Sequence, residues 1–113
     1  MRPLGKKVKS DLEKDEFMKK CCYCGTQKSI EFNHALIYGG RQMDEAYAVT
    51  PLCSDCHRGD NGTIKKEIRD YCTLLAITRG LPKILKDYPK RDWLWEKKYL
   101  EDKVRRYMID KKI

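Results

Sequence analysis

Four of the six cysteines stand in two pairs whose spacing is typical of a metal site. Two residues separate Cys21 from Cys24, and two separate Cys53 from Cys56. Each such turn lets both sulfurs and nearby backbone N–H groups face one ion, so two pairs can supply four thiolates in a tetrahedron. Gly25, directly after the first pair, tolerates the positive φ of a tight turn at little cost. The spacing therefore predicts a structural Zn²⁺ site.

The other two cysteines, Cys22 and Cys72, are not expected to join this group. A single residue separates Cys22 from Cys24, which is too short for the usual turn, so we expect a free thiol. Cys72 falls on the apolar face of a predicted helix, where cysteine packs as a small hydrophobic residue. Two redox pairs or chance spacing remain alternatives to zinc, although neither pair has the βαβ surroundings of a thioredoxin-like protein.

The two histidines, His34 and His57, both lie close to these cysteines. His34 stands in the β-prone segment "EFNHAL", and His57 directly follows the fourth cysteine in "PLCSDCHRG". A single histidine on an apolar strand is usually structural. A zinc ion that holds strand and helix together would bring both imidazoles to one side of the fold, which favours a functional site.

Three segments, "CCYCG", "FNHALIYGG" and "TPLCSDCHRG", resemble the HNH endonucleases, in particular the small phage-encoded members with zinc knuckles. The resemblance covers residues 21–63 and implies a treble-clef-like ββα-metal fold that cleaves phosphodiester bonds in DNA. It implies that His34 is the general base that deprotonates the attacking water. It also implies that His57 and Asn33 bind the catalytic cation, Mg²⁺ or another divalent ion.

The chain departs from the HNH pattern at three positions. Asn33 stands where the family usually has Asp or His, Ala48 where many members have an Asn that orients the base, and Ile64 where some phage relatives carry a further His. An Asn carbonyl can bind Mg²⁺ but brings no charge, so affinity for the cation should fall. These departures keep a second function open, a catalytically inactive, zinc-stapled module that binds nucleic acid.

The net charge of +8 is concentrated outside the cysteine-bearing centre. Residues 64–113 carry fifteen Lys and Arg against eight Asp and Glu, whereas residues 21–63 are mildly acidic. Basic segments on either side of the centre suit a polyanion partner, which we expect to be DNA, with RNA as the alternative. Solvated helix faces have the same composition and would explain the charge equally well. The cations expected to contact phosphates, without reading bases, are Arg41, Arg58, Lys65 and Lys66.

We expect one α+β domain over residues 1–113. It comprises a basic N-terminal arm and helix (1–20), the zinc-stapled core (21–63) and a basic helical extension (64–113). Hydrophobic residues make up 41% and charged residues 37%, so the core should be thin and a metal staple useful. Strands are predicted in "SIEFNHALIYGG" and "AYAVTPLC", with room for an inserted hairpin between the cysteine pairs.

Capping residues predict the helix boundaries. Ser10 and Glu13 form a capping-box pattern at the start of a first helix, and Thr63 could cap a second one that ends at Gly80 and Pro82. The following segment "LPKILKDYPK" is predicted to form irregular turns. Asp92 should then cap a last helix.

The last helix also raises a third possible function, a protein-interaction adaptor. Trp93 lies on its apolar stripe, whereas Trp95 falls off that stripe and is expected to be exposed.

No apolar run approaches the length of a membrane span or a secretory signal, so we expect a protein of the cytoplasm, the host cytoplasm if phage-encoded. Cutting both DNA strands with one small site would require a homodimer or two successive binding and cleavage events.

Overall fold

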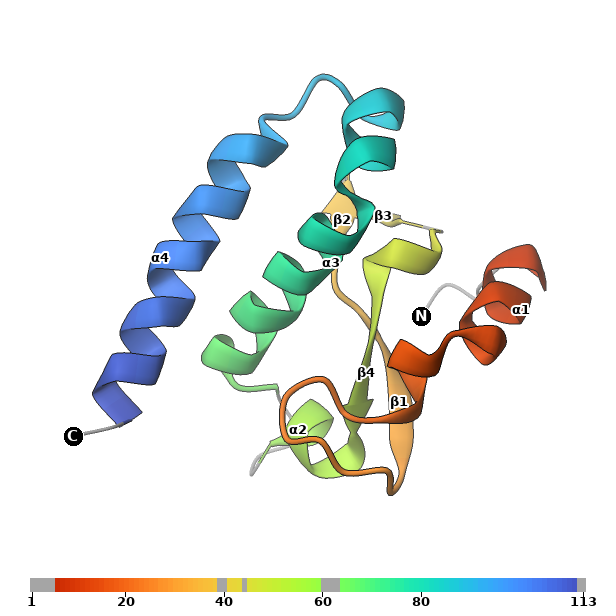
Figure 1. Cartoon of the computed structure of the whole chain (residues 1–113), viewed down its shortest axis with the longest axis vertical. Helices are drawn as coiled ribbons and strands as arrows, with labels where there is room; N and C mark the ends of the chain where they lie inside the picture. The colour runs from red at the N-terminus through yellow and green to blue at the C-terminus, as the bar shows by residue number, and fades with distance from the viewer. Residues whose placement is uncertain (1–5, 39–40, 44, 60–63, 112–113) are drawn as a thin grey trace.

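The computed structural model describes residues 6–38, 41–43, 45–59 and 64–111 (Figure 1). Thr63, which the sequence suggests as a helix cap, lies outside these residues. The elements in chain order are α1 (Lys6–Lys14), the 3₁₀ helix η1 (Glu16–Lys19), β1 (Ile30–His34), β2 (Ile37–Tyr38), β3 (Arg41–Gln42), the 3₁₀ helix η2 (Ala46–Ala48), β4 (Val49–Cys53), α2 (Ser54–Arg58), α3 (Lys66–Asp87) and α4 (Trp93–Lys111).

The two predicted strands pair with each other. β1 and β4 run antiparallel, with Ile30 opposite Cys53 and His34 opposite Val49. Successive side chains of a strand point to opposite faces. On one face Phe32 packs into a cluster formed with α1 and η1, in which Leu12 is only 2% exposed. The pairing therefore places the second cysteine pair directly beside the start of β1.

A second, smaller hairpin fills the space between the cysteine pairs. β2 and β3 pair antiparallel, with Ile37 opposite Gln42. The Met43 N–H donates to the Leu36 carbonyl at 3.2 Å, and both side chains are buried in the cluster that underlies α3 and α4. The inserted hairpin that the sequence leaves room for is thus present.

The long helix α3 corrects one prediction, because it continues past Gly80 and Pro82 to Asp87. Gly80 does not end the helix: a Cβ at this position would overlap the ring of Tyr47, so glycine allows η2 to approach α3 closely. Pro82 removes one backbone donor from the helix. The following turn nevertheless forms, and its Ile84 is fully buried in the core. Packing therefore outweighs the local helix-breaking signal.

The first helix corrects a second prediction. α1 spans Lys6–Lys14, so Ser10 lies in its interior and does not cap its start. The capping residue in this region is Asp15, whose Oδ1 accepts a hydrogen bond from the Phe17 N–H at 3.0 Å at the start of η1. The buried position of Leu12 shows which face of α1 meets the sheet.

The last helix begins as predicted. The Asp92 Oδ1 atom accepts a hydrogen bond from the Trp95 N–H at 3.1 Å, and α4 then runs alongside α3 on the side away from the β1–β4 ribbon (Figure 1). Trp93 is fully buried and donates its Nε1–H to the Tyr88 carbonyl. Trp95 is 61% exposed, as expected, and stacks on Tyr99 with ring centroids 5.2 Å apart.

Across the described segments, no helix combines the length and the apolarity that crossing a membrane requires.

Candidate metal centre and adjoining cleft

The four paired cysteines converge on one point. The Sγ atoms of Cys21, Cys24, Cys53 and Cys56 all lie within 4.8 Å of one another, and those of Cys24 and Cys53 are 3.6 Å apart. In a tetrahedral site with Zn–S bonds of about 2.3 Å, neighbouring sulfurs are roughly 3.8 Å apart. The structure therefore confirms a four-cysteine group that could hold a metal ion such as zinc.

Both cysteine pairs adopt the same local turn. The N–H of Cys24 donates to Cys21 Sγ, and the N–H of Cys56 donates to Cys53 Sγ, each at 3.5 Å. Gly25 has the expected positive φ of +82° and donates its N–H to the Cys21 carbonyl at 2.9 Å. These bonds aim the sulfurs before any ion binds, which reduces the entropy lost on binding.

The thiols of the group differ in how readily they ionise. Burial opposes ionisation of Cys21, but backbone hydrogen bonds, led by that from Cys24, outweigh it and lower the pKa of the Cys21 thiol to about 6. Burial and the neighbouring sulfurs raise the pKa of Cys56. The Cys21 thiolate therefore forms easily and disfavours ionisation of Cys56, and a bound cation would favour the thiolate form of both.

The remaining two cysteines meet each other outside this group. The Cys22 Sγ lies 3.8 Å from the Sγ of Cys72, which is fully buried in α3. The Cys22 N–H also donates to the Pro51 carbonyl at 2.9 Å and joins the first cysteine turn to β4. Both are free thiols, so the predictions for Cys22 and Cys72 are confirmed.

His57 is held by a carboxylate that the sequence reasoning did not single out. Its Nδ1 lies 2.8 Å from Glu31 Oε1, and the Arg58 Nη2 donates to the other oxygen, Oε2, at 2.9 Å. The hydrogen bond from His57, followed by the charge of Arg58, lowers the pKa of the Glu31 carboxyl. An ionised carboxylate only accepts, so Nδ1 carries the hydrogen of this bond, and in the neutral imidazole Nε2 keeps its lone pair. This lone pair can bind a metal ion.

Asn33 lies on the same face of β1 as Glu31, two residues further along the strand. Its Nδ2 donates to Thr50 Oγ1 across the β1–β4 pair at 3.1 Å. The bond uses the nitrogen of the amide, the atom that cannot bind a cation. The carbonyl oxygen is the ligand atom that the Asn33 side chain can offer.

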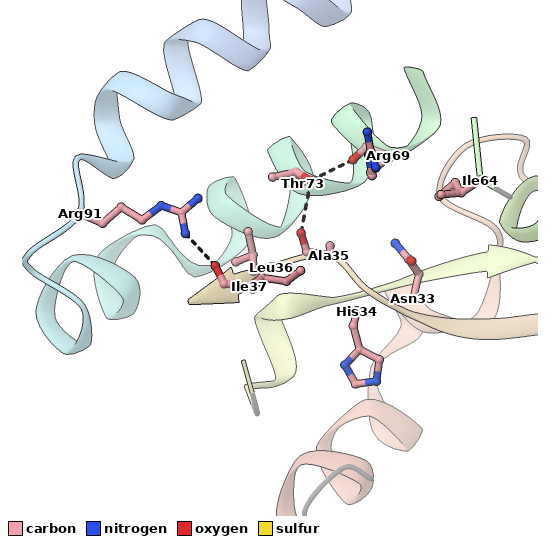
Figure 2. A pocket seen from close by; sticks show the side chains of 9 residues that line it. All are labelled: Asn33, His34, Ala35, Leu36, Ile37, Ile64, Arg69, Thr73 and Arg91. Carbon is pink, nitrogen blue, oxygen red and sulfur yellow. Dashed lines mark hydrogen bonds between the residues drawn. The ribbon is translucent and has the colours of Figure 1, made fainter. Parts of the chain in front are cut away.

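His34 points to the other face of the strand. Figure 2 shows its ring projecting toward the N-terminal helical segment, whereas Asn33 projects toward α3. Both residues nevertheless line one cleft of about 350 Å³ at the end of β1. Its other walls come from the residues that follow β1 and from Ile64, Arg69, Thr73 and Arg91. His57 is not among the described residues that line this cleft.

The predicted DNA-contacting cations differ in their surroundings. Lys65 and Lys66 are exposed at the start of α3, while Arg58 is exposed but engaged with Glu31. The side chain of Arg41 lies outside the described part of the structure.

Three residues of the site were missed by the sequence reasoning. Glu31 could have been found from strand periodicity, because it stands two residues before Asn33. Arg69 and Arg91 carry no such signal, since only the packing of α3 and α4 brings them to the end of β1.

Comparison of the chain with protein-family models, with curated proteins and with solved structures found no match.

Proposed function

We propose that the protein is a metal-dependent nuclease that hydrolyses phosphodiester bonds in DNA, with a structural zinc ion at the four cysteines. The observation that carries the proposal is the contact of 2.8 Å between His57 Nδ1 and Glu31 Oε1. Metal-binding histidines almost always donate their second ring N–H to a carboxylate, a carbonyl or water, which fixes the tautomer and the ring orientation. His57 has this arrangement, directly beside the zinc-binding Cys56.

His57 Nε2 and Asn33 Oδ1 are the atoms we assign to a catalytic divalent cation, Mg²⁺ or another. When bound, such an ion would polarise the scissile phosphate and stabilise charge on the leaving oxygen. Glu31 keeps the His57 ring aimed, while the Arg58 guanidinium, 2.9 Å from Glu31 Oε2, balances the charge of the carboxylate.

His34 is the residue we assign as general base. An in-line displacement places the attacking water on the side of the phosphorus opposite to the leaving oxygen, so a base and a cation need not share one face of the strand. Among the described strands, β1 pairs with β4 alone, and a phosphate at the other edge can be reached from both faces. His34 Nδ1 is buried, so Nε2 is the atom assigned to proton transfer.

A zinc-stapled module that binds nucleic acid without cutting it is the second candidate. Two observations favour it: Asn33 brings no charge to a cation, and Ala48, which stands where an orienting Asn is expected, is 1% exposed and has no polar side chain. The resemblance to HNH endonucleases and the Glu31–His57 pair support the nuclease over this module. DNA is the proposed partner, RNA the alternative, and a homodimer would allow cleavage of both strands.

Replacing Glu31 with Gln tests whether the contact between Glu31 and His57 orients a metal ligand. Loss of the carboxylate charge should raise the concentration of Mg²⁺ or Mn²⁺ needed for half-maximal nicking of supercoiled plasmid by about 10- to 100-fold, because the neutral amide of Gln orients the His57 ring less firmly than a charged acceptor does. Glu16→Gln removes an equal charge from an exposed pair with Lys19 and should leave the metal requirement unchanged. An unaltered metal requirement in Glu31→Gln would show that this pair does not orient a ligand.

A further inference from the structure

We propose that the cleft beside β1 binds one unpaired nucleotide of the substrate strand, with Arg69 contacting its phosphate. The inference rests on the proposed function in one respect, that the polymer bound is nucleic acid. It adds a binding residue and a substrate class, DNA that is single-stranded next to the site of cleavage.

The charge of the cleft suits a phosphate. Its lining includes two guanidinium groups, those of Arg69 and Arg91, and no carboxylate among the described residues. Arg69 is exposed on α3, one helical turn before Thr73, so its guanidinium is accessible to a ligand (Figure 2). A guanidinium presents paired donors that match two phosphate oxygens.

Arg91 has a different role from Arg69, because contacts within the protein hold its side chain in place. Its Nη1 donates to the Ile37 carbonyl at 2.7 Å, its Nε donates to Glu96 Oε1 at 2.8 Å, and its guanidinium carbon lies 4.4 Å from the centre of the Trp93 ring. Arg91 therefore forms a fixed wall of the cleft and joins α4 to the small hairpin. Its charge remains part of the cleft, although Glu96 offsets it.

The floor of the cleft is fixed in the same way. The Thr73 hydroxyl lies 3.2 Å from the Ala35 carbonyl, to which it donates, and 2.9 Å from the carbonyl of Arg69 one turn earlier (Figure 2). The Ala35 N–H in turn donates to the Ala48 carbonyl at 2.8 Å. The residues that follow His34 are thus tied to both α3 and η2, and a ligand would meet a preformed site.

The size and the apolar lining of the cleft indicate what accompanies the phosphate. A volume of about 350 Å³ lies at the lower end of the range for small-ligand sites, which suits one nucleotide. Ile37 is 56% exposed beside the cleft, and Ile64 contributes a second apolar wall. Such surfaces can pack against a base and a sugar, but a base that is paired inside a duplex could not enter. The cleft therefore favours an unpaired nucleotide.

Fluorescence anisotropy with a short labelled single-stranded oligonucleotide, and with the matching blunt duplex, tests the proposal without added Mg²⁺. Wild type should bind the single strand more tightly than the duplex. Arg69→Gln should weaken single-strand binding about tenfold, as expected for one charge-assisted hydrogen-bonding contact. It should also reduce the slope of log affinity against log salt by about 0.7. Arg106→Gln, a change of the same kind at an exposed position of α4, should weaken binding no more than about twofold.

Zinc content and circular dichroism would verify that each variant is folded, and Arg69→Lys, which keeps the charge but not the paired donors, should bind with intermediate affinity. Equal losses in Arg69→Gln and Arg106→Gln would overturn the proposal, as would duplex binding as tight as single-strand binding. If wild type binds the single strand through Arg69 but never cuts DNA, the nuclease proposal is refuted and the proposal of nucleotide binding in the cleft stands. If wild type cuts DNA and Arg69→Gln binds the single strand normally, the nuclease proposal stands and the proposal of nucleotide binding in the cleft is refuted.

Discussion

The substitution His34→Ala is expected to reduce nicking of supercoiled plasmid by about 10²- to 10⁴-fold, the usual contribution of a general base. Alanine cannot accept the proton of the attacking water, while the neighbouring Asn33 keeps its bond to Thr50. Because His34 contributes nothing to the four-cysteine group, zinc content should remain that of wild type. Initial nicking rates at saturating Mg²⁺, with DNA binding measured in parallel, would give the result.

His57→Ala is the matched comparison for His34→Ala. It should also lose activity, but through weaker binding of the cation, so higher concentrations of Mn²⁺ should restore part of its rate. They should not restore His34→Ala, in which the metal ligands are intact. Nicking by His34→Ala at the rate of wild type would exclude this residue as the base.

The substitution Cys53→Ser is expected to cost the protein its zinc and most of its folded structure. Cys53 is 5% exposed at the junction of β4 and α2, where its Sγ accepts the Cys56 N–H and contacts the Cys24 Sγ. In zinc-finger peptides the binding of structural zinc supplies on the order of 10 kcal/mol of apparent folding free energy. The net stability of a folded domain is about 5–15 kcal/mol, so the loss of a contribution of that size would leave little or none of it.

Thermal unfolding followed by circular dichroism, with the metal content measured on the same samples, would test this. Cys22→Ser is the control, since Cys22 neighbours two of the proposed ligands yet its Sγ faces Cys72 and not the group. Treatment of wild type with a zinc chelator should reproduce the unfolding of Cys53→Ser. A Cys53→Ser protein that keeps one equivalent of zinc and an unchanged Tm would refute the structural role of the site.

The sequence predicts most of the four-cysteine core because the signals for it are local. A two-residue gap between cysteines defines a turn whatever surrounds it, and Gly25 has the positive φ that this turn requires. The pairing of β1 with β4 follows from two β-prone segments that each adjoin a cysteine pair. Asp92 likewise caps α4 through a bond that spans three residues.

The features that depend on packing between distant segments could not be predicted in this way. Gly80 carries a helix-ending signal, yet the absent side chain serves contact with Tyr47, more than thirty residues earlier. The cleft forms only where α3 and the loop before α4 meet the end of β1, which is how Arg69 and Arg91 come together. Glu31 could have been predicted, because strand periodicity places it on the same face of β1 as Asn33, but the sequence reasoning missed it.

The most direct measurement of the proposed activity is nicking of supercoiled plasmid by zinc-loaded wild-type protein, with and without added Mg²⁺ or Mn²⁺. The proposal predicts conversion to the open-circular form that depends on the added cation. Folded, zinc-loaded protein that binds the plasmid but leaves it supercoiled at every concentration of cation would contradict the nuclease and leave a zinc-stapled DNA-binding module.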